Sequence, residues 1–154
     1  MAQALLNSAR YDAPQHVLVA DDSEVSRALM RRLLTRNGYV AHEAENGENT
    51  LRIAEQFPPD LLLLDLRLPD IDGSTVLGYL RAKFDPIQLP IIMVSAEDDG
   101  EVIAGCLSIG ANDYVTKPIH WPTLKARIQT HLGVHVGHAL LAAERRRAEL
   151  RPVQ

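Results

Sequence analysis

Leu61-Leu62-Leu63-Leu64-Asp65 is the stretch that decides the fold, because it joins an uninterrupted aliphatic run to a carboxylate. Four leucines without polar alternation indicate a strand buried on both faces, which is typical of a parallel sheet covered by helices. Asp65 then lies at the carboxyl end of this strand, the edge at which open α/β sheets bind ligands. The following loop, Arg67 to Gly73, is predicted to be tight and free of helix.

Strands and helices alternate on either side of this stretch. The strands are predicted at His16–Ala20, Tyr39–Ala44, Leu61–Leu64, Pro90–Val94 and Asp113–Thr116. The helices are expected to begin near Ser23, Gly47, Ser74, Glu97 and Pro122, and the last to end near Leu132. In the first helix, the apolar residues at helical spacing are Val25, Leu29, Leu33 and Leu34. Five repeats of strand and helix predict an α/β fold, with a doubly wound five-stranded parallel sheet flanked by helices.

Three segments are expected: a flexible N-terminal segment (1–14), the α/β domain (15–133) and a C-terminal helical extension or linker (134–154). The extension has a partial heptad formed by Val136, Leu140, Ala143, Arg147 and Leu150. Two heptads are too few to predict a coiled coil, so a dimer seam and a simple extension of the last helix both stay open. His131, His135 and His138 share one helical face, for which we expect solvation rather than a transition-metal site.

Composition narrows the class of protein. The chain has 154 residues, 46% of them hydrophobic, which is enough for a substantial core. Its formal net charge of −4 disfavours nucleic-acid binding by the domain itself. Cys106 is the sole cysteine, so an intramolecular disulfide is impossible and a reducing compartment is expected. Residues 1–15 resemble neither a signal peptide nor a membrane anchor, and a cytoplasmic location is therefore expected.

The carboxyl ends of the predicted strands bring polar groups to one edge of the sheet. They are Asp21, Asp22, Asp65, Ser95 and Lys117. Three neighbouring carboxylates repel one another and need a cation, for which their oxygen atoms suit Mg²⁺ better than Zn²⁺. The ammonium and hydroxyl groups would complete a pocket for phosphoryl oxygens, with Asp65 as the nucleophile that forms an aspartyl phosphate.

Other nucleotide and hydrolase sites are disfavoured. The turn after the first strand, Ala20 to Glu24, is acidic and lacks the glycines with which a dinucleotide site receives phosphate. The sequence contains neither a GxSxG pattern nor a P-loop, so it has no motif of a serine hydrolase or an NTPase.

Taken together, these motifs resemble those of the receiver domain of two-component response regulators, a flavodoxin-like, CheY-like fold. The resemblance covers roughly residues 15 to 133. It rests on Asp21-Asp22, on Asp65 with Pro69 and Gly73, on Ser95-Ala96 and on Lys117-Pro118, which occur in the family's order and spacing. The extension resembles the helices that join receivers to an output domain.

The resemblance implies that Asp65 accepts a phosphoryl group from a histidine kinase or a histidine phosphotransfer protein. Mg²⁺ would be held by Asp22, Asp65 and the backbone carbonyl of Arg67, while Asp21 would act through a metal-bound water. Lys117 would pair with Asp65 at rest and with the phosphoryl oxygens afterwards.

The resemblance also implies a switch. Ser95 would bond the phosphoryl group and draw its loop inward, and Tyr114 would turn inward with it, changing a partner surface. The Lys117-Pro118 bond would be cis. Ser95 stands where threonine is commoner, and Arg67 and Glu97 stand at variable positions that influence phosphorylation kinetics in the family.

Two other functions remain alternatives. One is a receiver-like module that binds partners without phosphorylation. The other is a Mg²⁺-dependent phosphohydrolase with an aspartate nucleophile, which would need a general acid two residues after Asp65, where Arg67 stands. We expect no enzymatic activity beyond the protein's own phosphorylation and dephosphorylation. A downstream output domain, and a homodimer through the switch face or the C-terminal helix, are open.

Overall fold

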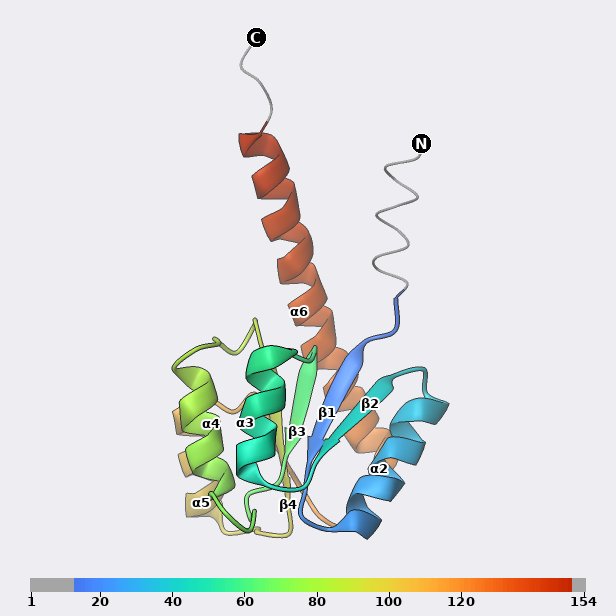
Figure 1. Cartoon of the computed structure of the whole chain (residues 1–154), viewed down its shortest axis with the longest axis vertical. Helices are drawn as coiled ribbons and strands as arrows, with labels where there is room; N and C mark the ends of the chain where they lie inside the picture. The colour runs from blue at the N-terminus through green and yellow to red at the C-terminus, as the bar shows by residue number, and fades with distance from the viewer. Residues whose placement is uncertain (1–12, 151–154) are drawn as a thin grey trace.

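The computed structural model describes residues 13–150 and shows one five-stranded parallel sheet within them (Figure 1). The strand order is β2-β1-β3-β4-β5, so the predicted doubly wound fold is confirmed. The strands are β1 (His16–Ala20), β2 (Val40–Ala44), β3 (Leu61–Leu64), β4 (Ile91–Ser95) and β5 (Asp113–Thr116). The helices are α2 (Glu24–Arg36), α3 (Gly47–Gln56), α4 (Gly73–Arg81), α5 (Gly100–Ile109) and α6 (Trp121–Glu149). Most of the segment predicted as flexible, residues 1–12, lies outside the described residues.

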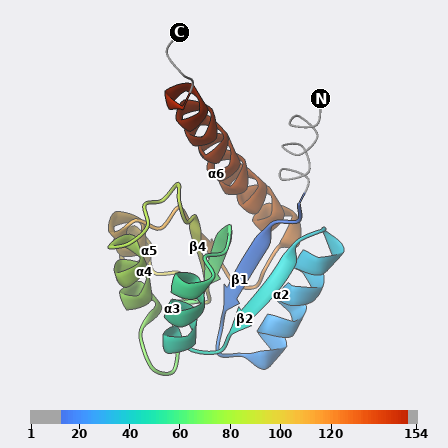
Figure 2. The ribbon, with the colours of Figure 1, turned by 45° about the horizontal axis from the view of Figure 1, so that its top comes forward.

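Strand β3 carries the core on both of its faces, as the run of leucines predicts. Leu62 and Leu64 belong to a cluster that includes side chains of α3, α4 and α5. Leu61 and Leu63 belong to a second cluster, formed with α2 and α6. Because successive side chains of a strand point to opposite faces, this one strand anchors both helical layers. Figure 2 shows the two layers, with α3 on one side of the sheet and α6 on the other.

Several local expectations are corrected by the structure. Strand β4 is Ile91–Ser95 rather than Pro90–Val94, and α5 begins at Gly100 rather than near Glu97, because Asp99 is its N-cap. Strand β2 begins at Val40 rather than at Tyr39, and α4 begins at Gly73 rather than at Ser74, because the extended Asp72 is its N-cap. On α2, the buried residues are Met30 and Leu34. Val25 and Leu29 are 81% and 50% exposed, because α2 covers the sheet along one narrow stripe only.

Helix α6 is continuous from Trp121 to Glu149, so the last domain helix and the predicted extension form one element. Its first half packs on the sheet through Leu124, Ile128 and Leu132, and its second half projects beyond the domain (Figure 1). Among residues 133–150 none is buried. Within the described residues, no helix combines the length and apolar character needed to span a bilayer.

The expectation that the histidines of α6 lie on a solvated face is wrong for two of them. His131 Nε2 lies 3.2 Å from a carboxylate oxygen of Asp113, at the start of β5. His135 lies 3.4 Å from Asp60, which immediately precedes β3. Acidic residues at the amino ends of two strands therefore hold this face of the helix against the domain.

Burial of β3 on both faces predicts that Leu63→Ala lowers the free energy of unfolding by about 2–5 kcal/mol, because a fully enclosed side chain leaves a cavity. Leu29→Ala, at a half-exposed position of α2, should change it by less than about 0.5 kcal/mol. Urea denaturation followed by circular dichroism measures both. Equal losses in the two variants would contradict the assignment of β3 as the shared core strand.

Candidate functional site

Asp21 and Asp65 are placed by the backbone of the sheet. The Asp65 N–H donates to the carbonyl of Ala20 at 2.9 Å, and the Asp21 N–H donates to that of Ala44 at 3.1 Å. Strand pairing thus continues one residue beyond β3 and β1. The two carboxylates emerge side by side at the carboxyl edge, where their side-chain positions depend little on loop conformation.

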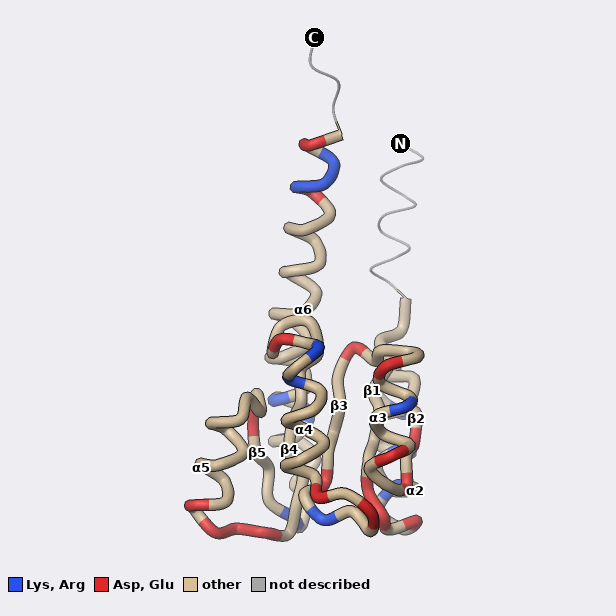
Figure 3. Tube along the Cα trace, turned by 60° about the vertical axis from the view of Figure 1, so that its left-hand side comes forward, with Lys and Arg blue, Asp and Glu red and all other residues tan. Residues whose placement is uncertain are grey.

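Three carboxylates converge at this edge. Asp21, Asp22 and Asp65 each offer an oxygen within 4.8 Å of the other two. Asp21 and Asp65 are 6% and 7% exposed, whereas Asp22 is open to solvent. Figure 3 shows acidic segments gathered at this end of the strands. The donor set consists of oxygen atoms only, with one accessible member, and therefore fits Mg²⁺, a hard cation that keeps several waters.

Lys117 closes the site on one side. Its Nζ lies 2.7 Å from Asp21 Oδ2 and 2.8 Å from Asp65 Oδ2, so a single ammonium bridges both buried carboxylates. Burial would lower the pKa of Lys117, but the hydrogen bonds and charges of the two aspartates outweigh it and raise the pKa above its ordinary value. Pairing with Asp65 was predicted from the resemblance, and pairing with Asp21 was not.

The backbone around Lys117 links β5 to β4. The Lys117 N–H donates to the Ser95 carbonyl at 2.8 Å, and the Lys117-Pro118 peptide is cis, as the resemblance implies. The register aligns Ser95 with Thr116 across β4 and β5. The predicted residues Ser95 and Lys117 are therefore delivered to the same edge as Asp65.

The two predicted switch residues meet at Glu97. Ser95 is 1% exposed, and its Oγ accepts a hydrogen bond from the Glu97 N–H at 3.3 Å. The Tyr114 hydroxyl donates to the Glu97 carbonyl at 2.7 Å, and its ring packs against the core cluster of α3, α4 and α5. Burial raises the pKa of the Tyr114 hydroxyl. In this structure the tyrosine is thus attached to the loop that Ser95 begins.

An ion pair that the sequence analysis missed spans the loops after β3 and β4. Arg67 Nη2 lies 3.1 Å from Glu97 Oε2, and the Arg67 N–H donates to Asp65 Oδ1 at 3.2 Å. The sequence places basic Arg67 two residues after Asp65 and acidic Glu97 two residues after Ser95. These opposite charges could have indicated the ion pair. The Arg67 side chain is 78% exposed, so the pair contributes little to stability but links the two loops beside Asp65.

The loop after Asp65 is held by Gly73 and Asp70. A Cβ on Gly73 would lie 2.2 Å from the Asp65 carbonyl oxygen, and the Gly73 N–H donates to the Leu66 carbonyl at 2.6 Å. The Asp70 carboxylate accepts the N–H groups of Gly47 and Glu48, at 2.7 and 2.9 Å, which lie at the start of α3 and have no acceptor within the helix.

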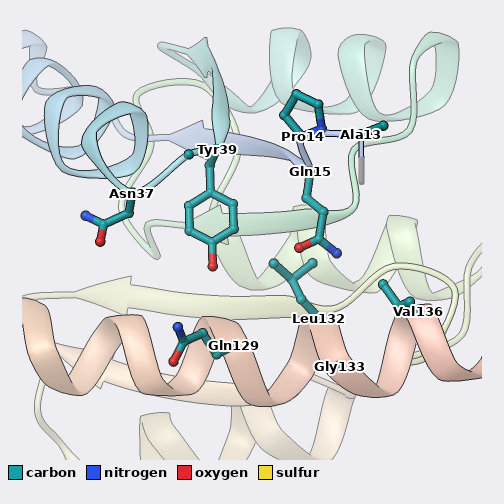
Figure 4. Close-up of a pocket in the computed structure, with 10 residues that line it drawn as sticks. Ala13, Pro14, Gln15, Asn37, Tyr39, Gln129, Leu132, Gly133 and Val136 are labelled. Atoms are coloured by element: carbon teal, nitrogen blue, oxygen red, sulfur yellow. The ribbon is translucent and has the colours of Figure 1, made fainter. Parts of the chain in front are cut away.

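A separate cleft, of about 540 Å³, lies at the opposite edge of the sheet (Figure 4). It is formed between the segment before β1, the turn before β2 and helix α6, and its lining contains no charged side chain. Figure 4 shows Tyr39 and Gln129 extending into the space between the sheet and α6. This cleft is not part of the acidic site.

Comparison with known proteins identifies the family. Residues 17–129 match the family model of the response regulator receiver domain. The chain belongs to this family, whose members act in two-component signal transduction. A receiver is the class of protein that both the sheet order and the acidic site with its lysine define.

Individual relatives are similar to the same part of the chain. The transcriptional regulatory protein KdpE of Mycobacterium tuberculosis is 41% identical over 113 residues, which are 73% of this chain and 49% of KdpE. A cyclic di-GMP phosphodiesterase of Thermotoga maritima is 33% identical over 79% of this chain and 32% of its own length. A CheY-like receiver domain protein of Methanospirillum hungatei superimposes with a TM-score of 0.76 at 25% identity, covering 81% of this chain and 98% of that one. This chain thus spans half or less of these two curated relatives.

Close packing at Gly73 predicts that Gly73→Ala lowers the free energy of unfolding by about 2–3 kcal/mol, because the added methyl group collides with backbone atoms that cannot move aside. Gly78→Ala on the same helix meets nothing within 4 Å and should raise stability by about 0.5–1 kcal/mol. Urea denaturation of both variants provides the measurement. A neutral effect of Gly73→Ala would show that the loop after Asp65 is not constrained in this way.

Proposed function

We propose that Asp65 accepts a phosphoryl group from a histidine kinase or a histidine phosphotransfer protein. The observation that carries the proposal is the position of Asp65 between an accessible cluster of carboxylates and Lys117. A nucleophilic carboxylate needs positive charge on both sides of the group that it receives, because charge develops on the phosphoryl oxygens during transfer.

In the proposed reaction, a carboxylate oxygen of Asp65 attacks the phosphorus of the donor's phosphohistidine. The new bond joins that oxygen to phosphorus, while the phosphorus–nitrogen bond breaks and its electron pair returns to the donor imidazole. Lys117 exchanges its contact with Asp65 for one with a phosphoryl oxygen and keeps its contact with Asp21. Asp22, Asp65 and the Arg67 carbonyl would hold Mg²⁺, with Asp21 acting through a water, and the metal would neutralise the remaining phosphoryl charge.

The response to phosphorylation would run through Ser95. Its buried hydroxyl would donate to a phosphoryl oxygen and pull the segment from Ser95 to Glu97 toward Asp65. Tyr114 is hydrogen-bonded to the Glu97 carbonyl, so a shift of this segment would move the ring and the adjoining surface of α5 and β5. The Arg67–Glu97 ion pair would have to adjust in the same step.

The partner of this changed surface is also a proposal. The chain covers only 49% and 32% of the two curated relatives, which supports an output domain as the receiver of the signal. A homodimer through the switch face or α6 is the other candidate. The receiver domain is proposed to extend over residues 15–133, with α6 beyond Gly133 as the connection.

We predict that incubation with acetyl phosphate and Mg²⁺ adds one base-labile phosphoryl group to the full chain, measured by intact mass spectrometry. Asp65→Asn should acquire none, because it lacks the nucleophile. Asp98→Asn is the matched control, since it removes an exposed carboxylate from the neighbouring loop and should be phosphorylated like the wild type. Absence of an adduct on wild-type protein that binds Mg²⁺ would favour a phosphorylation-independent module instead.

Asp22→Asn should weaken Mg²⁺ binding by about tenfold or more, because one of three clustered negative charges is lost. Isothermal titration calorimetry with MgCl₂ measures this change, and Asp98→Asn again serves as the control. Unchanged affinity in Asp22→Asn would place the cation elsewhere.

A further inference from the structure

Helix α6 changes its mode of attachment after Leu132. Up to that point aliphatic side chains bury it against the sheet. Beyond it the described residues are exposed or half-buried, and His135 makes polar contacts with the domain. His135 therefore contacts the domain at the amino edge of the sheet, through Asp60, which immediately precedes β3. Figures 1 and 2 show α6 projecting beyond the domain.

The ring of His135 faces two acceptors. Nδ1 lies 2.7 Å from the carbonyl oxygen of Ile87, and Nε2 lies 3.4 Å from a carboxylate oxygen of Asp60. Neither partner can donate a hydrogen. A neutral imidazole has one N–H, so it can satisfy only one of these acceptors and turns a lone pair toward the other. The imidazolium form has two N–H groups and satisfies both.

Asp60 is held as a carboxylate in this arrangement. Its other oxygen accepts the backbone N–H of His16 at 2.7 Å. Burial tends to raise the pKa of Asp60, but the hydrogen bonds from His135 and His16 outweigh it, and the pKa is lowered. The pKa of His135 is raised, chiefly by its hydrogen bond to Asp60. The side chains of His135 and Asp60 are 20% and 35% exposed, so solvent screens this pair in part.

The other titratable groups near this contact in residues 13–150 have partners of their own. His16 and His42 bond to each other through ring nitrogens 2.7 Å apart. On α6, His131 contacts Asp113, as does Arg127, one turn earlier. Asp85 lies in the turn that also contains Ile87. Its pKa is lowered chiefly by the backbone N–H of Gln88 and to a smaller extent by the charge of His138. His135 is the group whose two ring nitrogens both meet domain acceptors.

We propose that His135 and Asp60 form a protonation-dependent latch that fastens the projecting part of α6 to the amino edge of the sheet. The latch is separate from the proposed phosphoryl chemistry and does not depend on it. Because the folded-state pKa of His135 is raised, the latch is fully fastened below the ordinary histidine pKa of about 6.5. It loosens as the pH rises through the folded-state pKa, since the ring then loses the positive charge that forms the ion pair with Asp60.

The first test is an NMR titration of the His135 ring in the full chain. The wild type should titrate above the ordinary histidine value, and Asp60→Asn should lower the midpoint by about one pH unit, because a carboxylate partner is lost. His138→Gln, on the same helix, is the control and should leave the His135 midpoint unchanged. A wild-type midpoint at or below the ordinary value, or one unaffected by Asp60→Asn, would overturn the latch.

The second test follows the helix itself by hydrogen exchange. Protection factors of the amides in residues 133–149, corrected for intrinsic exchange, should fall by up to about tenfold as the pH rises through the His135 midpoint. His135→Gln should show low protection throughout and little pH dependence. If the ring titrates as expected but protection in the wild type is independent of pH, the histidine does not fasten the helix and the proposal fails.

Discussion

The contact on which the site depends is the one between the Lys117 ammonium and the carboxylates of Asp21 and Asp65. Two nearly buried carboxylates side by side would repel each other strongly, and an uncompensated buried charge destabilises a fold. Lys117 is separated from Asp21 by 96 positions in the sequence and is aligned through Ser95, so the contact also unites β1, β3 and β5 at one edge. In the proposed reaction, the phosphoryl group would be added to a site where Lys117 already compensates the charges of two carboxylates.

The positions of these charged groups depend on β3, a strand that is buried on both faces. Because β3 contributes leucines to both helical layers, its position is fixed by packing and not by the loops that surround the site. Gly73 lacks a Cβ and therefore allows the end of the following loop to pass close to the Asp65 carbonyl, and Asp70 ties that loop to the start of α3. The rigid strand positions Asp65, the proposed nucleophile, while the loop after β4, with its polar contacts to Tyr114 and Arg67, is the part that is proposed to respond.

Helix α6 connects the two edges of the domain. It begins four residues after Lys117, runs along the sheet on aliphatic contacts and leaves the domain at the edge where Asp60 and Asp113 meet its histidines. Asp60 and Asp65 flank the four leucines of β3, about 16 Å apart at the usual strand rise. One strand thus carries an acidic group at each end: one at the site and one at the exit of the C-terminal helix.

The sequence by itself determined the α/β alternation, the buried β3 and the strand-end positions of Asp65, Ser95 and Lys117, because hydrophobic periodicity and strand direction are local properties. Only the tertiary structure decided which groups pair. The bond of Lys117 to Asp21, the Arg67–Glu97 ion pair and the partners of His131 and His135 join residues far apart in the chain. Such contacts depend on sheet register and helix placement, and no local pattern of residues encodes either.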